Sequence, residues 1–73
     1  MEKYTIIFHT SEQVKDFIGW AVKIPYNMDA SIGSITVDAK SLLGITGLGL
    51  EKKFLLVIYG ELSDKEKSYI QQY

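Results

Sequence analysis

Apolar and polar residues alternate along the first part of the chain. In residues 3–8 one face of the pattern is apolar, and its members are Tyr4, Ile6 and Phe8. A repeat of two residues is typical of a β-strand with one buried face. Residues 54–59 are apolar on both faces, as in a central strand, and Gly60 follows them. We therefore predict strands over residues 3–8 and 54–59.

Three segments instead have the signals of helices. Thr10 precedes apolar residues at helical spacing, its hydroxyl can accept from the amide of Gln13, and Gln13 can reach back. Since Pro25 cannot continue a helix, we predict the first one over residues 11–24. Ser41 can cap a short second helix that ends at Gly47 or Gly49, and residues 63–66 form a capping box before a third helix.

The remaining segment predicts a hairpin. Residues 26–31 contain few helix formers, and Gly33-Ser34 gives a tight reversal before Ile35-Thr36-Val37. The predicted order is β-α-β-β-α-β-α, an α+β open-faced β-sandwich with a four-stranded antiparallel sheet and three helices on one face. We expect residues 1–73 to form one domain, with strands 3–8 and 54–59 side by side inside the sheet.

Composition narrows the possible functions. The 73 residues include one His and no Cys, and the formal net charge is −1. Disulfides are therefore absent, and we expect no structural metal site and no cofactor. The charge does not favour nucleic acid or an anionic membrane as a partner. Because no apolar run reaches the length of a membrane span and the first residues do not resemble a signal peptide, we expect a cytoplasmic protein.

Residues 37–50 carry a family resemblance. Lys40-Ser41-Leu42-Leu43-Gly44 is similar to the Lys-Ser-aliphatic-Met-Gly segment of the HPr family, the small phosphocarriers of the bacterial sugar phosphotransferase system. Tyr26-Asn27-Met28-Asp29 resembles the stretch that follows the first helix in many members. The resemblance spans nearly the whole chain. It implies regulatory phosphorylation of Ser41 and a partner-binding patch that includes Leu42, Leu43 and Thr46.

The chain departs from the family pattern between the first strand and the first helix. HPr proteins have Gly-Ile-His-Ala-Arg-Pro-Ala there, and the histidine accepts a phosphoryl group. This chain has Thr10-Ser11-Glu12-Gln13-Val14-Lys15-Asp16, with no His, Arg or Pro. The acceptor position falls near Glu12, and a carboxylate is a poor substitute for an imidazole nucleophile. The only imidazole, His9, lies about three residues earlier, and we take it as a polar strand end rather than an acceptor.

The leading hypothesis is an HPr-like regulatory or binding protein, related to the sugar phosphotransferase system, without phosphocarrier activity. Its protein partners would bind the start of the first helix, at Glu12, and the second helix. One alternative is a diverged phosphocarrier that uses His9, and another is a structural module that associates with itself. The open sheet face would then support a homodimer, because it carries either Phe54, Leu56 and Ile58 or Leu55, Val57 and Tyr59.

Overall fold

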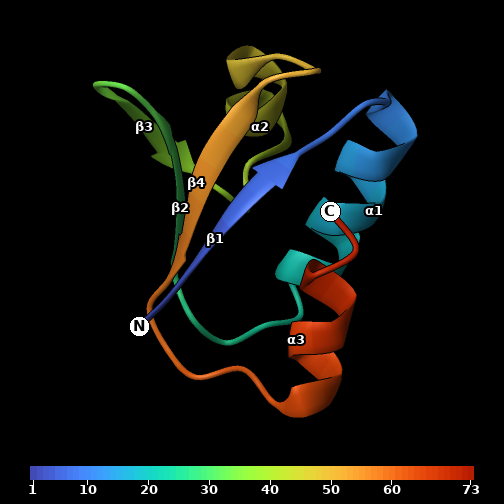
Figure 1. The fold of residues 1–73 in the computed structure, drawn as a ribbon, viewed down its shortest axis with the longest axis vertical. Coiled ribbons are helices and arrows are strands. Elements are labelled where there is room, and N and C mark those ends of the chain that lie inside the picture. The colour runs from blue at the N-terminus through green and yellow to red at the C-terminus, as the bar shows by residue number, and fades with distance from the viewer.

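The computed structural model describes residues 1–73 and contains the expected elements in the expected order (Figure 1). The strands are β1 (Glu2–Ile7), β2 (Met28–Ile32), β3 (Ile35–Asp38) and β4 (Lys53–Ile58). The helices are α1 (Ser11–Ala21), α2 (Leu42–Leu48) and α3 (Asp64–Ile70). The predicted α+β class and the β-α-β-β-α-β-α order are confirmed. No helix has the length and apolar content needed to span a bilayer.

All four strands form one antiparallel sheet in the order β1-β4-β2-β3. β4 lies between β1 and β2, and its Leu56 is opposite Tyr4 on one side and Ala30 on the other. The prediction that β1 and β4 are neighbours is confirmed. The prediction that both lie inside the sheet is wrong, because β1 pairs with β4 alone and is an edge strand. The alternation of β1 buries only one face, and its exposed Lys3 is typical of a sheet edge.

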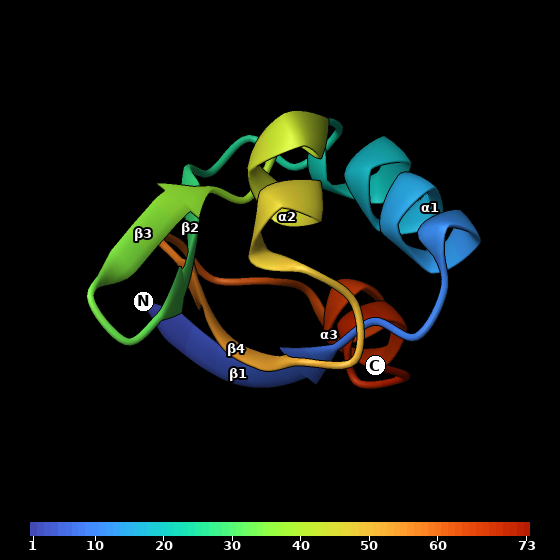
Figure 2. The ribbon, with the colours of Figure 1, turned by 90° about the horizontal axis from the view of Figure 1, so that it is seen from above.

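The hydrophobic core lies on one face of this sheet and consists of 16 buried apolar residues. The sheet contributes Ile6 and Leu56, while Phe17 of α1, Ile45 of α2 and Ile70 of α3 belong to the same cluster. The three helices therefore cover the same face, as predicted. In Figure 2, α1 and α2 lie next to each other above the strands.

The first helix is shorter than the sequence predicts. α1 ends at Ala21, not at residue 24. The amides of Lys23 and Ile24 bond carbonyl oxygens three residues back, those of Trp20 and Ala21, at 3.1 Å each. These tighter turns replace the α-helical pattern before Pro25. Ile24 is buried and keeps the apolar spacing of a helix, although the backbone has already left the α-helix.

α3 is held against α1 by aromatic and polar contacts. The hydroxyls of Tyr69 and Tyr73 donate to the carboxylate of Asp16 at 2.5 and 2.9 Å. Trp20 stacks on Tyr69 with their ring centroids 4.7 Å apart. The hydrogen bonds from Tyr69 and then Tyr73 hold the pKa of Asp16 below its usual range. Burial and the bond to Asp16 raise the pKa of Tyr69. The C-terminal residues are therefore held against α1 by hydrogen bonds to the Asp16 carboxylate and by stacking on the Trp20 ring.

The second face of the sheet carries no helix. Phe54, Leu56 and Ile58 are buried in the core, so the alternate residues of β4 point to the open side. The apolar residues of this alternation are Leu55 and Val57 of β4 and Tyr59 just after it, and we call these three the β4 stripe. Leu55 and Val57 are flanked by polar register partners on both neighbouring strands. These partners are Lys3, Thr5, Asp29 and Ser31. Around Leu55 and Val57 the apolar surface is therefore narrow, and Ile7 of β1, opposite Lys53, adds to it at one end of the sheet.

Candidate functional site

Ser41 caps α2, as the sequence predicts. Its backbone is extended, and its hydroxyl oxygen accepts a hydrogen bond from the amide of Gly44 at 3.0 Å. The third residue of α2 approaches the end of β3 closely. A Cβ on Gly44 would lie 3.1 Å from the carbonyl oxygen of Asp38, so a glycine at this position lets the helix pack against the strand. The cap and the close approach together fix where α2 begins.

α2 separates its apolar side chains into two groups. Ile45 and Leu48 are buried in the core, as expected from their spacing. Leu42 is 42% exposed and Leu43 is 84% exposed, so the leucines of this helix are not all part of the core. Thr46 is exposed, and its hydroxyl donates to the carbonyl oxygens of Leu42 and Leu43 within the helix. Because that hydroxyl is already bonded to the backbone, Thr46 adds little free hydrogen-bonding capacity to this surface.

Lys40 connects the start of α2 to the end of α1. Its ammonium group donates to the carbonyl oxygen of Ile24 at 2.5 Å, in a partly buried contact. Lys40 is therefore not the fully solvated charge that a lysine in a polar loop suggests. Ile24 lies in the turns that follow α1, and its carbonyl oxygen gains a hydrogen-bond donor from this ammonium group. The residue before the capping serine thus helps to fix α2 beside α1.

The junction between β1 and α1 is closed by a local hydrogen-bond pattern. Thr10 caps α1, with its hydroxyl oxygen 3.2 Å from the amide of Gln13. The side chain of Gln13 turns back, as expected, but it accepts from the amide of His9 at 2.7 Å. Glu12 is exposed in the first turn of α1. This turn therefore presents a carboxylate at the position where the family resemblance implies an acceptor histidine.

His9 has a specific partner that the sequence analysis did not identify. Its Nδ1 atom lies 2.9 Å from a carboxylate oxygen of Glu51, and both side chains are more than half exposed. The amide of Glu51 also donates to the carbonyl oxygen of Phe8 at 2.8 Å. With a proton on Nδ1 the ring donates to Glu51, and Nε2 has its lone pair free. The contact links the start of α1 to the segment that follows α2.

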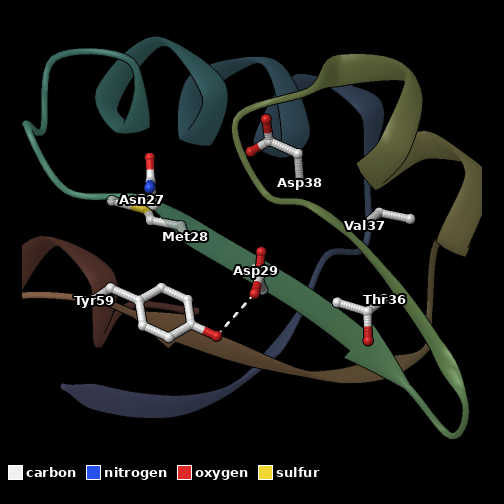
Figure 3. A pocket seen from close by; sticks show the side chains of 7 residues that line it. All are labelled: Asn27, Met28, Asp29, Thr36, Val37, Asp38 and Tyr59. Atoms are coloured by element: carbon white, nitrogen blue, oxygen red, sulfur yellow. Dashed lines mark hydrogen bonds between the residues drawn. The ribbon is translucent and has the colours of Figure 1, made fainter.

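A hollow of about 510 Å³ lies on the open side of the sheet (Figure 3). Its lining includes Asp29, Asp38 and Tyr59, a cluster that the sequence analysis did not identify. Asp29 and Asp38 are opposite each other on β2 and β3. The hydroxyl of Tyr59 donates to Asp29 at 2.8 Å, and this bond raises the pKa of Tyr59. Asp38 accepts from the amide of Lys40 at 2.9 Å. The hollow is therefore lined by two carboxylates and by the tyrosine ring whose hydroxyl is bonded to one of them.

The candidate residues lie on two separate surfaces. Ser41, Leu42, Leu43 and Thr46 belong to α2, and α2 packs against α1, which carries Glu12. The acidic hollow belongs to the sheet face that no helix covers. No group of three or more His, Asp or Glu side chains is arranged to hold a metal ion.

Comparisons with known proteins agree with this arrangement at the level of the fold. No family model matches the sequence. No curated protein matches it. Among solved structures, the chain is similar to HPr-C-His from Thermoanaerobacter tengcongensis, with a TM-score of 0.78 and 20% identity over 99% of this chain and 89% of that one. It is also similar to the histidine-containing phosphocarrier protein of Mycoplasma, with a TM-score of 0.74 and 14% identity over 97% and 89% of the two chains. The chain therefore has the HPr-like fold, an α+β open-faced β-sandwich.

Proposed function

We propose that this chain is a regulatory or binding protein built on the HPr fold, which docks a protein partner without itself carrying a phosphoryl group. The docking surface consists of Leu42, Leu43 and Thr46 of α2 together with Glu12 of α1. The partner belongs to the sugar phosphotransferase system. This assignment combines the resemblance of residues 37–50 to HPr proteins with the exposure of α2.

The observation that carries the proposal is the exposure of Leu43. A leucine that is 84% exposed contributes little to its own fold, while its helix is anchored by Ile45 and Leu48 on the opposite side. Leu42 extends the apolar surface next to it. An exposed apolar patch that is not part of the core is suited to binding another protein, particularly when its helix is held firmly in place.

The junction between β1 and α1 supports the second half of the proposal. Residues 10–16 contain no imidazole, arginine or proline. The first turn of α1 instead carries the carboxylate of Glu12, which repels an incoming phosphoryl group. The hydroxyl of Thr10 already occupies the amide of Gln13 at the helix end. This segment therefore lacks both the imidazole acceptor and the arginine that the family resemblance places at this position.

Ser41 is the proposed point of regulation. Phosphorylation would add nearly two negative charges beside Leu42 and Leu43, at a helix end that tolerates an anion. The hydroxyl oxygen that caps Gly44 is the atom that would be modified. We expect the added charge to change partner binding more than folding, because the cap position already accepts hydrogen bonds from the helix amides.

The proposal can be tested by titrating the isotope-labelled protein with the phosphotransferase enzyme that transfers phosphoryl groups from phosphoenolpyruvate to HPr proteins. Amide resonances of residues 42–48 and of the first turn of α1 should shift, while those of β3 should not. Leu43→Glu should abolish the shifts, because it places a charge at the centre of the docking surface.

Ile35→Glu is the matched control. Ile35 is 59% exposed and lies on β3, outside the docking surface, so this variant should bind as the unmodified chain does. Binding that survives Leu43→Glu, or that is lost equally in Ile35→Glu, would contradict the proposal. So would resonance shifts confined to the open face of the sheet.

A diverged phosphocarrier that uses His9 is the second candidate. The 2.9 Å contact with Glu51 favours it, because a carboxylate on Nδ1 fixes the ring and leaves Nε2 free as a nucleophile. Against it, the chain has no arginine near this ring to stabilise the transferred group. Detection of a phosphoryl group on His9 would establish that the chain is a phosphocarrier.

A further inference from the structure

Two rows of side chains cross the open face of the sheet. Lys3 and Asp29 are both register partners of Val57, and Asp38 is opposite Asp29. Register partners share a face, so these four residues form one row across the strands. The neighbouring row, defined in the same way, consists of Thr5, Leu55, Ser31 and Thr36. Each row thus has an apolar residue of β4 between polar residues.

The charged groups of the first row have no partner of opposite charge within the chain, although Asp29 and Asp38 accept hydrogen bonds from the Tyr59 hydroxyl and the Lys40 amide. Lys3 and Asp29 lie two strand spacings apart, about 10 Å, which is too far for an ion pair. The only close contact between a basic and an acidic side chain joins His9 and Glu51. Asp29 and Asp38 are also opposite each other, an arrangement that is unfavourable for like charges. The β4 stripe therefore has a positive flank on β1 and a negative flank on β2 and β3.

We propose that this face binds a second copy of the chain about a two-fold axis that runs along β4. Such an axis places β1 of each copy over β2 of the other. The residues of the β4 stripe then meet their own symmetry mates at the centre. The ammonium group of each Lys3 lies over Asp29 of the other copy and close to Asp38, so two equivalent ion pairs form.

The charges select this axis over the other face-to-face arrangement. A two-fold axis across the strands would place β1 over β1 and β2 over β2, and every charge of the first row would lack a partner of opposite sign. With the axis along β4, the strands of the two sheets stay nearly aligned, as in β-sandwiches. Lys53 lies at the end of β4, where its long side chain can turn into solvent.

The area buried between the two copies indicates how tightly the proposed dimer should associate. The two rows meet across β1, β4 and β2, which cover on the order of a few hundred square ångströms per copy from the spacing of strands and residues. This is below the area of a stable interface, so the dimer is of the weak class. We expect self-association at protein concentrations on the order of 100 μM and above. The surface is remote from α2, and this inference does not depend on the proposed docking function.

Sedimentation of the full chain from about 10 μM to about 1 mM tests the proposal. The unmodified chain should shift from monomer to dimer. Lys3→Glu and Asp29→Lys should each weaken association by about tenfold, because like charges then face each other twice across the axis. An equimolar mixture of the two variants should associate again, since each contact between different variants restores opposite charges.

Lys65→Glu is the matched control, because it makes the same change of charge on the exposed side of α3. It should associate as the unmodified chain does, and amide spectra at low concentration should show that all variants fold. A chain that stays monomeric throughout would overturn the proposal. A mixture that associates no better than either variant alone would also overturn it, as would a Lys65→Glu variant weakened as much as Lys3→Glu.

Discussion

Leu43 and Leu48 lie on the same short helix, so replacing each by alanine distinguishes the proposed docking surface from the core. Leu43 is 84% exposed, whereas Leu48 is 7% exposed. Full burial of a leucine side chain stabilises a fold by about 1.5–3 kcal/mol. Only about a sixth of Leu43 is buried, so Leu43→Ala should lower the free energy of unfolding by less than about 0.5 kcal/mol. Leu48→Ala also leaves a cavity and should cost about 2–5 kcal/mol.

Urea and thermal denaturation, each followed by the fluorescence of the single tryptophan, Trp20, measure the free energy of unfolding and the Tm of both variants. A loss of 1 kcal/mol corresponds to a fall of roughly 4–8 °C in Tm for a domain of this size. Leu43→Ala should therefore be nearly indistinguishable from the unmodified chain, and Leu48→Ala should melt well below it. If Leu43→Ala cost as much as Leu48→Ala, Leu43 would be a structural residue and could not define a docking surface.

Three further predictions concern the cap, a close contact and pH. Ser41→Ala should cost about 0.5–2 kcal/mol in a denaturant titration, because it removes the cap of α2. Gly60→Ala should cost about 1–3 kcal/mol in the same titration, because its Cβ would overlap the ring of Tyr26. The lowered pKa of Asp16 adds stability that is present above the ordinary carboxyl pKa of about 4 and is lost as pH falls through the folded pKa. Asp16→Asn should therefore lose less stability than the unmodified chain between about pH 5 and pH 2 in thermal melts.

Much of the fold could be predicted because its elements have local signals. Alternation identified the buried face of β1, and the Ser41 and Ser63 caps marked the starts of two helices. The place of β1 at the sheet edge could not be predicted in this way. Both edge and inner strands can show one buried face, and strand order depends on pairings between distant segments.

The candidate site was predictable where it follows from local sequence and not where it depends on distant contacts. A short helix with apolar residues on two sides either buries both sides or leaves one exposed, and the sequence alone does not decide which of these happens at Leu43. The contacts of His9 with Glu51 and of Lys40 with Ile24 join segments separated along the chain, and no spacing rule indicates them. By contrast, the pairing of Asp29 with Asp38 does follow from local sequence. Counting outward from the two-residue turn at Gly33-Ser34 pairs Asp29 with Asp38.

We propose that this chain, although it has the HPr-like fold, does not carry a phosphoryl group. Incubation with phosphoenolpyruvate and the phosphotransferase enzyme, followed by mass spectrometry of the intact chain at neutral pH, tests it directly, with an HPr protein as the positive control. We predict that the control is phosphorylated and that this chain is not. A stoichiometric, acid-labile phosphoryl group on this chain that disappears in His9→Gln would contradict the claim and establish His9 as the acceptor.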